Sequence, residues 1–356
     1  MNDRHEARVL LSVLAERWGD AAALQAKTPV DPVAFLALCK TTDVAATVHA
    51  KLAKAGRSGF MGPVVADGLE RSRAKIRVDN LLLIARLEQA LDLLLAAGIR
   101  PVALKGVDVL HRLYGSFDER SLDDVDLLVR RDERDAAIAV LERAGFAGPP
   151  EPARTHWLRS SFELPLTSPG PVGVAFEMHW NVGQALRYRI DPAALIERAV
   201  PLDVSGRSIL RLDEHDAVAH LLLHHVQHYF DRRLKWVLEI GMLAGSPAFS
   251  WPRVADRLRG WGGPAAAGLA LAHVRELFPS MLPASAYDAL PAAPWRVAVT
   301  WPLRASHPLD FYRGTRRRAV QLAIAAVALE RPWDLPAYMR HRAVRDRDAG
   351  FDGRDA

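Results

Sequence analysis

Two aspartates separated by a single residue form a pair that could do chemistry. Asp124 and Asp126 flank Val125, and the run that follows, Leu127-Leu-Val129, is rich in apolar residues typical of a strand. Residues two apart on a strand project from the same face, so the two carboxylates point the same way. Together they could bind divalent cations such as Mg²⁺ or Mn²⁺, which prefer oxygen ligands.

A third carboxylate could complete such a site. Glu177 lies in the strand-like run Ala175-Phe-Glu-Met-His179, and it would join the aspartates if the two strands were neighbours. Glu163, on the preceding strand-like segment, is the alternative third acid. Two metal ions held in this way clamp the attacking and leaving oxygens of a phosphoryl displacement. An Asp-x-Asp pair by itself is more often solvated surface, so the pattern needs support from its surroundings.

An α/β core over residues 99–205 is predicted to position these acids. Its expected strands are 100–104, 125–129, 161–167 and 172–180, and its expected helices are 106–114 and 132–144. The flanks have apolar residues at helical spacing, which predicts a helical N-terminal region over 1–98 and a C-terminal helical domain over 206–356. The first contains helices over 5–18, 32–55 and 63–97, and the second contains helices over 213–230, 233–244, 252–259, 264–278, 313–329 and 334–345.

Four segments between about 95 and 245 resemble a known family, the bacterial uncharacterised nucleotidyltransferases of the polymerase-beta superfamily. They are Leu104-Lys-Gly106, Arg120 with Asp124 to Val129, Glu177-Met-His-Trp180, and His220 to His228 followed by Arg233-Leu-Lys-Trp-Val-Leu-Glu239. The resemblance implies an α+β fold with a polymerase-beta-like nucleotidyltransferase core, in which helices pack on a mixed sheet. It also implies an enzyme that moves a nucleoside monophosphate from a nucleoside triphosphate to a hydroxyl-bearing acceptor and releases pyrophosphate.

The same resemblance implies roles for individual residues. Asp124, Asp126 and Glu177 would hold the Mg²⁺ or Mn²⁺ ions as the catalytic acids, with Glu177 as a candidate base. Lys105-Gly106 stands where the wider superfamily has a Gly-Ser pair against the triphosphate; glycine permits close backbone approach and lysine supplies a point charge. Further candidates for nucleotide binding are Arg120, His179, His224, Arg233 and Lys235. The acceptor could be a small molecule, a peptide or protein side chain, or tRNA.

Several of these residues have simpler interpretations. Lys105 could neutralise Asp108 or another acidic neighbour, and Arg120 could form a structural salt bridge. His220, His224 and His228 recur every four residues on one helical face, where two histidines can bind zinc. No Glu of a His-Glu-x-x-His motif accompanies them, so packing beneath the active site is the preferred interpretation.

Composition narrows the class of protein. The chain has 356 residues, a formal net charge of +5 and a single cysteine, which excludes an intramolecular disulfide and a cysteine-based zinc site. We expect no signal peptide and no membrane span, and a cytoplasmic setting fits. Arginines crowd the last quarter, at 313, 316–318, 331, 340, 342, 345 and 347, and could attract an anionic acceptor or simply be solvated. The functional alternatives are an inactive nucleotide-binding scaffold and a helical RNA- or protein-binding adaptor.

Overall fold

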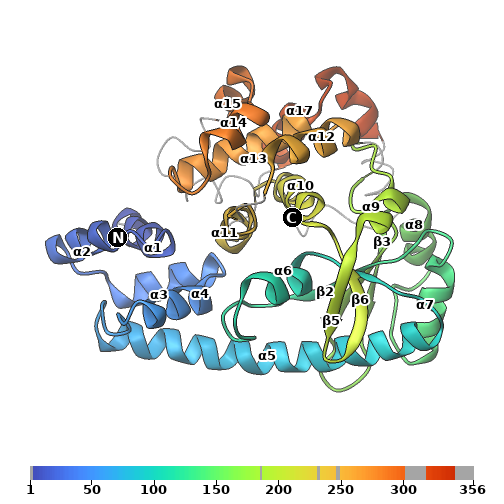
Figure 1. Cartoon of the computed structure of the whole chain (residues 1–356), viewed down its shortest axis with the longest axis horizontal. Helices are drawn as coiled ribbons and strands as arrows, with labels where there is room; N and C mark the ends of the chain where they lie inside the picture. The colour runs from blue at the N-terminus through green and yellow to red at the C-terminus, as the bar shows by residue number, and fades with distance from the viewer. Residues whose placement is uncertain (1–2, 185–186, 231–232, 246–248, 301–317, 341–356) are drawn as a thin grey trace.

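A mixed six-stranded sheet forms the centre of the computed structural model, which describes residues 3–184, 187–230, 233–245, 249–300 and 318–340 (Figure 1). The strands lie in the order β3-β4-β2-β1-β6-β5, so β3 and β5 are the outer strands. β2 runs parallel to β4 and β1 runs parallel to β6, whereas the other pairs are antiparallel. The bounds are β1 (Val102–Ala103), β2 (Asp124–Leu128), β3 (Glu163–Thr167), β4 (Ala175–His179), β5 (Val200–Val204) and β6 (Arg207–Arg211).

Helices surround this sheet and make the fold α+β, as predicted. The N-terminal helices are α1 (Asp3–Leu14), α2 (Trp18–Lys27), α3 (Pro32–Thr41), α4 (Ala45–Lys54) and α5 (Pro63–Ala96). Between the strands lie α6 (Lys105–Leu113), α7 (Arg134–Arg143), α8 (Ala153–Ser160) and α9 (Pro192–Arg198). The C-terminal helices are α10 (Glu214–Gln227), α11 (Leu234–Leu243), α12 (Trp251–Trp261), α13 (Pro264–Leu277), α14 (Ala284–Ala289), α15 (Pro294–Thr300) and α17 (Arg318–Ala328), followed by the 3-10 turn η2 (Pro332–Asp334).

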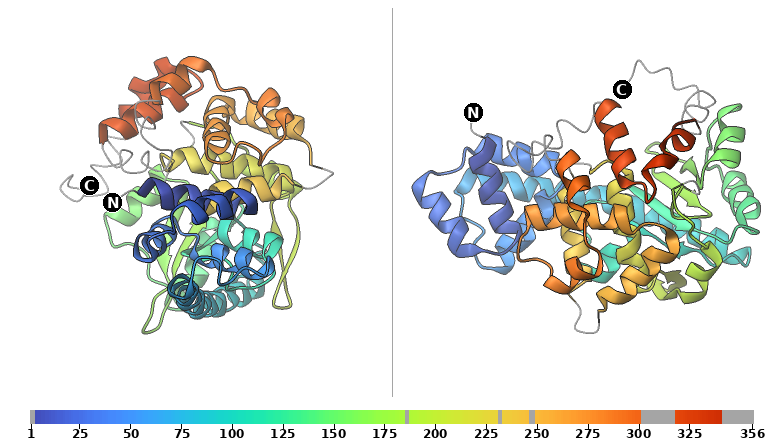
Figure 2. Two further views of the ribbon diagram at one scale, coloured as in Figure 1. Left: turned by 90° about the vertical axis from the view of Figure 1, so that its left-hand side faces the viewer. Right: turned by 90° about the horizontal axis from the view of Figure 1, so that it is seen from above.

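Helix α5 links the N-terminal helices to the sheet. It is 34 residues long and ends shortly before Gly98, whose φ of 76° is the left-handed conformation that stops a helix. Leu87, Leu91 and Leu94 on its buried side enter the core beneath the sheet. Figure 1 shows α5 running beneath both the N-terminal helices and the strands, while Figure 2 shows the C-terminal helices on the opposite side of the molecule.

Strand alternation sorts apolar and polar residues onto two faces of the sheet. Val125 and Leu127 of β2 enter the core that α5 and α7 help to form, and Phe176 and Met178 of β4 enter the same core. Because successive side chains on a strand point to opposite faces, the intervening residues face α10 and α11 instead. Those residues are Asp124 and Asp126 on β2, and Glu177 and His179 on β4.

Several parts of the fold differ from the sequence-based expectation, and helices α2, α8, α9, α14 and α15 were not predicted. The helix expected over 32–55 is two helices, because Asp43 between α3 and α4 adopts a φ of 57°. The β5–β6 hairpin was not predicted at all, since Pro201 and Asp203 weaken the strand pattern. Its turn contains Ser205 and Gly206, so the predicted core boundary at 205 lies inside this hairpin. The helices expected over 313–329 and 334–345 lie only partly within the described residues.

The described residues contain no single helix that is both long enough and apolar enough to cross a membrane. Only α3 and α4 taken together meet that criterion, and the two helices are bent by 113° at the break between them. Phe35 and Cys39 of α3 and Val48 and Leu52 of α4 are buried in the protein core.

Candidate active site

Asp126 and Glu177 are brought together by the parallel pairing of β2 and β4, in which they are direct register partners. His179, two residues along β4 on the same face, places its Nε2 2.9 Å from Asp126 Oδ1 and 3.3 Å from Glu177 Oε2. One ligand atom from each of these three side chains lies within 4.8 Å of the other two. The spatial relationship expected for Asp126 and Glu177 is therefore present, and His179 joins it.

Lys105 projects into this acidic group from the first turn of α6. Its Nζ lies 2.6 Å from Asp126 Oδ1 and 3.3 Å from Glu177 Oε2. Asp108 is paired instead with Arg112, four residues along the same helix. The sequence left two possibilities open for Lys105, which were Asp108 and another acidic neighbour. The structure shows contacts with the acidic neighbours Asp126 and Glu177.

In this cluster, interactions between the charged side chains shift the pKa values of His179 and Glu177 in the direction opposite to the effect of burial. Burial disfavours the charged imidazole, but hydrogen bonds to Asp126 and Glu177 outweigh it and raise the pKa of His179 to about 9. Burial also opposes ionisation of Glu177, yet the His179 hydrogen bond and the Lys105 cation hold its pKa well below the ordinary value. Without a metal ion, Lys105 and His179 thus supply the positive charge that the carboxylates need.

Asp124 lies at the start of β2, opposite Ala175, and is not one of the three residues in the close cluster. Burial and then repulsion from Asp126 raise the pKa of Asp124 to about 7. Glu163 approaches from β3, where it is the register partner of His179. Its Oε2 lies 3.3 Å from His179 Nδ1, without the alignment of a hydrogen bond. Glu177, rather than Glu163, is the acid beside Asp126.

This donor set fits a divalent cation. Asp126 and Glu177 offer carboxylate oxygens, His179 offers an imidazole nitrogen, and Asp124 stands next to them on the same face. Carboxylates suit Mg²⁺ and Mn²⁺, and imidazole suits several transition metals. The ions would replace the positive charge that Lys105 now supplies.

A cavity of about 60 Å³ opens beside the acids. It is lined by all the site residues predicted from the sequence except His179, and additionally by Asp123, His228 and Trp236. Pockets that hold whole small ligands measure roughly 300–1,000 Å³. The cavity as it stands therefore matches a phosphate-sized group, and a complete nucleotide would extend beyond it.

The histidines of α10 pack beside this cavity. The ring of His224 lies 4.2 Å from that of His228 and 4.5 Å from that of Trp236 on α11, measured between centroids. Burial holds the pKa values of His220 and His224 well below the ordinary value, so both are neutral near pH 7. Among the described residues, Asp126, Glu177 and His179 form the only group of at least three His, Cys, Asp or Glu side chains whose ligand atoms lie close enough to hold a metal ion. The packing role preferred from the sequence agrees with these contacts.

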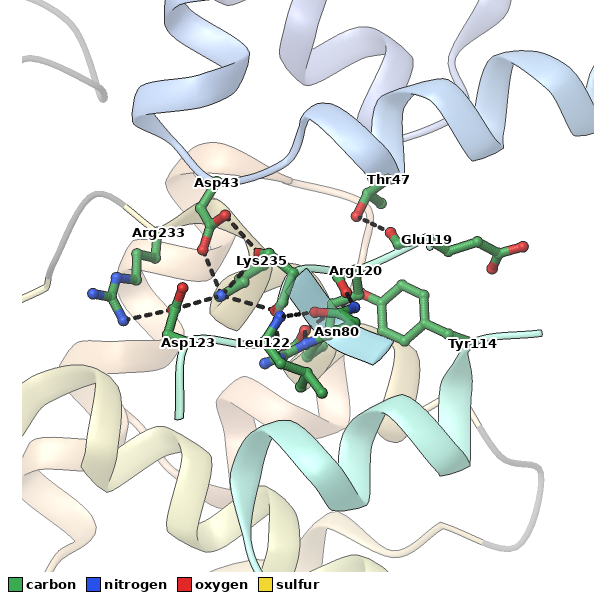
Figure 3. Close-up of polar contacts among 12 residues, drawn as sticks. Asp43, Thr47, Asn80, Tyr114, Glu119, Arg120, Leu122, Asp123, Arg233 and Lys235 are labelled. Carbon is green, nitrogen blue, oxygen red and sulfur yellow. Dashed lines mark hydrogen bonds and ion pairs between the residues drawn. The ribbon is translucent and has the colours of Figure 1, made fainter. Parts of the chain in front are cut away.

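The three other positively charged residues predicted for nucleotide binding are Arg120, Lys235 and Arg233, and each has a defined partner in the structure (Figure 3). Arg120 Nε donates to Glu239 Oε1 at 2.7 Å in a buried pair, which corresponds to the structural salt bridge considered in the sequence. Lys235 Nζ lies 3.0 Å from Asp123 Oδ2 and also contacts Asp43. The half-exposed Arg233 reaches the same Asp123 oxygen at 3.1 Å, with its guanidinium 5.1 Å from the Trp236 ring centroid.

Sequence reasoning missed Glu239, Asp43 and Asn80 as partners of these residues. Glu239 is the last residue of the segment that begins at Arg233. Its position four residues after Lys235, about one helical turn, is the signal that could have identified it. Asp43 and Asn80 carry no comparable signal. Most arginines of the predicted basic face lie outside the described residues, as does the side chain of Arg318.

A larger cavity of about 600 Å³ lies elsewhere, between α6, α10 and α12. Two of its charged groups have partners within the protein: Arg112 pairs with Asp108, and Asp213 caps the first turn of α10. It contains none of the predicted site residues. The chemistry therefore belongs to the smaller cavity.

Comparison with known proteins identifies a family. Residues 28–279 match the model of the family described as "Uncharacterised nucleotidyltransferase". No curated protein matches the chain. Among solved structures, the crystal structure of an antigenic nucleotidyltransferase-like protein from Paracoccidioides brasiliensis is 14% identical, covers 60% of this chain and 94% of its own, and has a TM-score of 0.36.

Proposed function

Because the chain belongs to the uncharacterised nucleotidyltransferase family, we propose that it is a metal-dependent enzyme that transfers a nucleoside monophosphate from a nucleoside triphosphate to a hydroxyl group. The observation that carries this proposal is the register pairing of Asp126 with Glu177, next to His179 and at the wall of a phosphate-sized cavity. The acceptor is a small molecule, a peptide or protein side chain, or an RNA end such as that of tRNA.

In the proposed reaction, the acceptor oxygen forms a bond to the α-phosphorus while the bond to the bridging oxygen breaks. Pyrophosphate leaves, and the hydroxyl proton passes to a carboxylate, for which Glu177 is our candidate. Glu177 is suited to this role because its side chain is 31% exposed and can meet an incoming acceptor, whereas that of Asp126 is 1% exposed. Positioning and charge stabilisation supply most of the catalysis in such transfers.

Asp126, Glu177 and His179 would hold a divalent cation, and Asp124 would hold a second one with Asp126. When bound, Mg²⁺ or Mn²⁺ would neutralise charge on the phosphates and on the attacking oxygen. Lys105 is then free to contact a phosphate as the acids exchange its ammonium for the metal. Gly106, Arg233 and His224 line the same cavity and would contact the nucleotide.

The test is a thermal-shift screen of nucleoside triphosphates with Mg²⁺ or Mn²⁺, followed by assay of pyrophosphate release across a panel of acceptors. The proposal expects stabilisation that requires both metal and triphosphate and that is lost in Asp126→Ala. Asp132→Asn is the matched control, because Asp132 is an exposed acid shortly after β2 that pairs with Arg130. Absence of any triphosphate effect in the wild-type protein would refute the proposal.

One observation favours a second candidate, a nucleotide-binding scaffold without turnover. Lys105 already neutralises Asp126 and Glu177, so the folded site does not need a metal ion to be stable. This candidate expects triphosphate binding with no pyrophosphate release for any acceptor. The same screen distinguishes the two candidates.

A further inference from the structure

Seven residues that lead into β2, here called the entry segment (117–123), are held by groups from outside the sheet (Figure 3). Since the segment ends immediately before Asp124, its position fixes where β2 presents its acids. The contacts from α4 and α5 are Thr47 Oγ1 to the carbonyl of Glu119 (3.0 Å), Arg73 to Asp118 (2.8 Å), and Asn80 to the backbone of Arg120 (2.6 Å) and Leu122 (2.9 Å).

Lys235 of α11 joins this segment to the N-terminal helices. Its ammonium is buried and contacts Asp43, the carbonyl and hydroxyl of Ser121 at 3.2 and 3.1 Å, and Asp123 at 3.0 Å. The Ser121 hydroxyl in turn donates to Asp43 Oδ1 at 2.6 Å. A lysine ammonium has three donors, so these acceptors use all of them.

Asp43, from outside the entry segment, and Asp123, the last residue of that segment, therefore share one buried cation. Removing the charge of Asp43 leaves Asp123 as the carboxylate partner of Lys235, and the ammonium is drawn toward it. Asp123 is bonded directly to Asp124, so such a shift displaces the start of β2. Asp43 itself does not line the cavity and does not belong to the acidic cluster.

We infer that Asp43, in the link between α3 and α4, is a positioning residue for the acids of β2 and acts through Lys235 and Ser121. This inference rests on the proposed function. Loss of an outer partner of a metal ligand typically costs about 10- to 100-fold in metal affinity or activity. A misplacement of roughly 1 Å can cost about 100-fold in rate.

The experiment uses the full-length protein and compares Asp43→Asn, Lys235→Met and the double variant with wild type. Free Mn²⁺ is measured by electron paramagnetic resonance to obtain the Mn²⁺ dissociation constant, and pyrophosphate release gives kcat and KM. Asp43→Asn is expected to weaken Mn²⁺ binding and to lower kcat about tenfold or more, with KM for the nucleotide little changed. The double variant should be no worse than Lys235→Met alone, because both changes break one connection.

Glu6→Gln is the matched control. Glu6 is a buried acid of the same N-terminal helices that accepts a hydrogen bond from the Asp31 backbone at 3.1 Å and does not contact the entry segment. It should leave Mn²⁺ affinity and kcat at wild-type values. Ser121→Ala provides a second route if Asp43→Asn does not fold, since it removes the hydroxyl between Asp43 and Lys235 without a change of charge and should give a smaller loss in the same direction.

The outcomes separate the inference from the proposed function. If wild type binds Mn²⁺ and releases pyrophosphate while a folded Asp43→Asn keeps its Mn²⁺ affinity and kcat, the inference is overturned and the function stands. A lower melting temperature with unchanged Mn²⁺ binding overturns it too, because that is a stability role alone. If wild type neither binds Mn²⁺ nor releases pyrophosphate, the proposed function fails and the inference fails with it.

Discussion

Asp126 and Glu177 lie side by side on the parallel strands β2 and β4, and the Lys105 ammonium lies within 3.3 Å of both carboxylates. Lys105 and the proposed divalent cation would therefore compete for the same oxygens. On this proposal the site has two charge states, one with Lys105 bound to the acids and one with metal bound.

Replacing Lys105 with methionine tests this competition. The metal-free variant should lose about 3 kcal/mol of unfolding free energy, because two carboxylates, one of them buried, lose one of their two cationic partners and keep only His179. Mn²⁺ should then raise the melting temperature more than it does in wild type. Urea unfolding and thermal shift with and without Mn²⁺ measure both effects.

Lys75→Met is the control, since the exposed Lys75–Asp79 pair should contribute less than about 1 kcal/mol. A smaller Mn²⁺ effect in Lys105→Met than in wild type would contradict the competition.

The buried pair of Arg120 and Glu239 predicts that substitutions at these two positions affect the unfolding free energy in a coupled way. Glu239→Ala should reduce the unfolding free energy by about 4 kcal/mol, because it leaves the buried Arg120 charge without a carboxylate. Arg120→Met combined with Glu239→Leu should be more stable than Glu239→Ala alone. Urea unfolding of the single and double variants measures the coupling. Asp135→Ala, which breaks the exposed pair with Arg134, should change stability by less than about 1 kcal/mol. Additive effects at 120 and 239 would argue against the pair.

Asn80 predicts a local effect on the entry segment. Its buried amide accepts from the Leu122 N–H and donates to the Arg120 carbonyl, so Asn80→Ala leaves buried backbone groups without partners. The expected loss is about 2 kcal/mol. Native-state hydrogen exchange should show faster exchange of the Leu122 amide, while amides of α13 stay as protected as in wild type. Equal protection of the Leu122 amide in both proteins would show that Asn80 does not hold the segment.

The buried histidine pair predicts the direction of pH dependence. His225 Nε2 lies 2.9 Å from His273 Nδ1, and burial lowers the pKa of His225 to about 3 from its usual 6.5. Below pH 6.5 the unfolded chain binds a proton at His225 that the folded chain does not, so stability is lost as the pH falls from 6.5 toward 3. His225 alone should contribute about 1.4 kcal/mol per pH unit. Urea unfolding at pH 7.0 and 5.5 should show a smaller difference in His225→Gln than in wild type; an identical difference would refute the assignment.

The sequence predicted the strands of the site better than it predicted what holds them. The residue pattern predicted strands over 125–129 and 172–180, and it placed Asp126 beside Glu177 only if these strands were neighbours, which they are. The family resemblance supplied the roles of the two acids. Ser205-Gly206 between two short runs was a usable hairpin signal, since both residues take positive φ, of 52° and 82°. Asp43 and Asn80 were out of reach because their partners are distant in sequence. One amino-acid sequence by itself contains no pattern that relates a buried polar residue in one helix to a loop that is distant from it in the sequence.

The two outer strands of the sheet each contain a proline, Pro165 in β3 and Pro201 in β5. Proline lacks an N–H, and it is tolerated in a strand where that missing donor would face outward. A strand from another molecule that approached either border would find a gap in the row of donors that it needs. One missing donor on each border thus weakens the pairing that edge-to-edge association of two sheets would need.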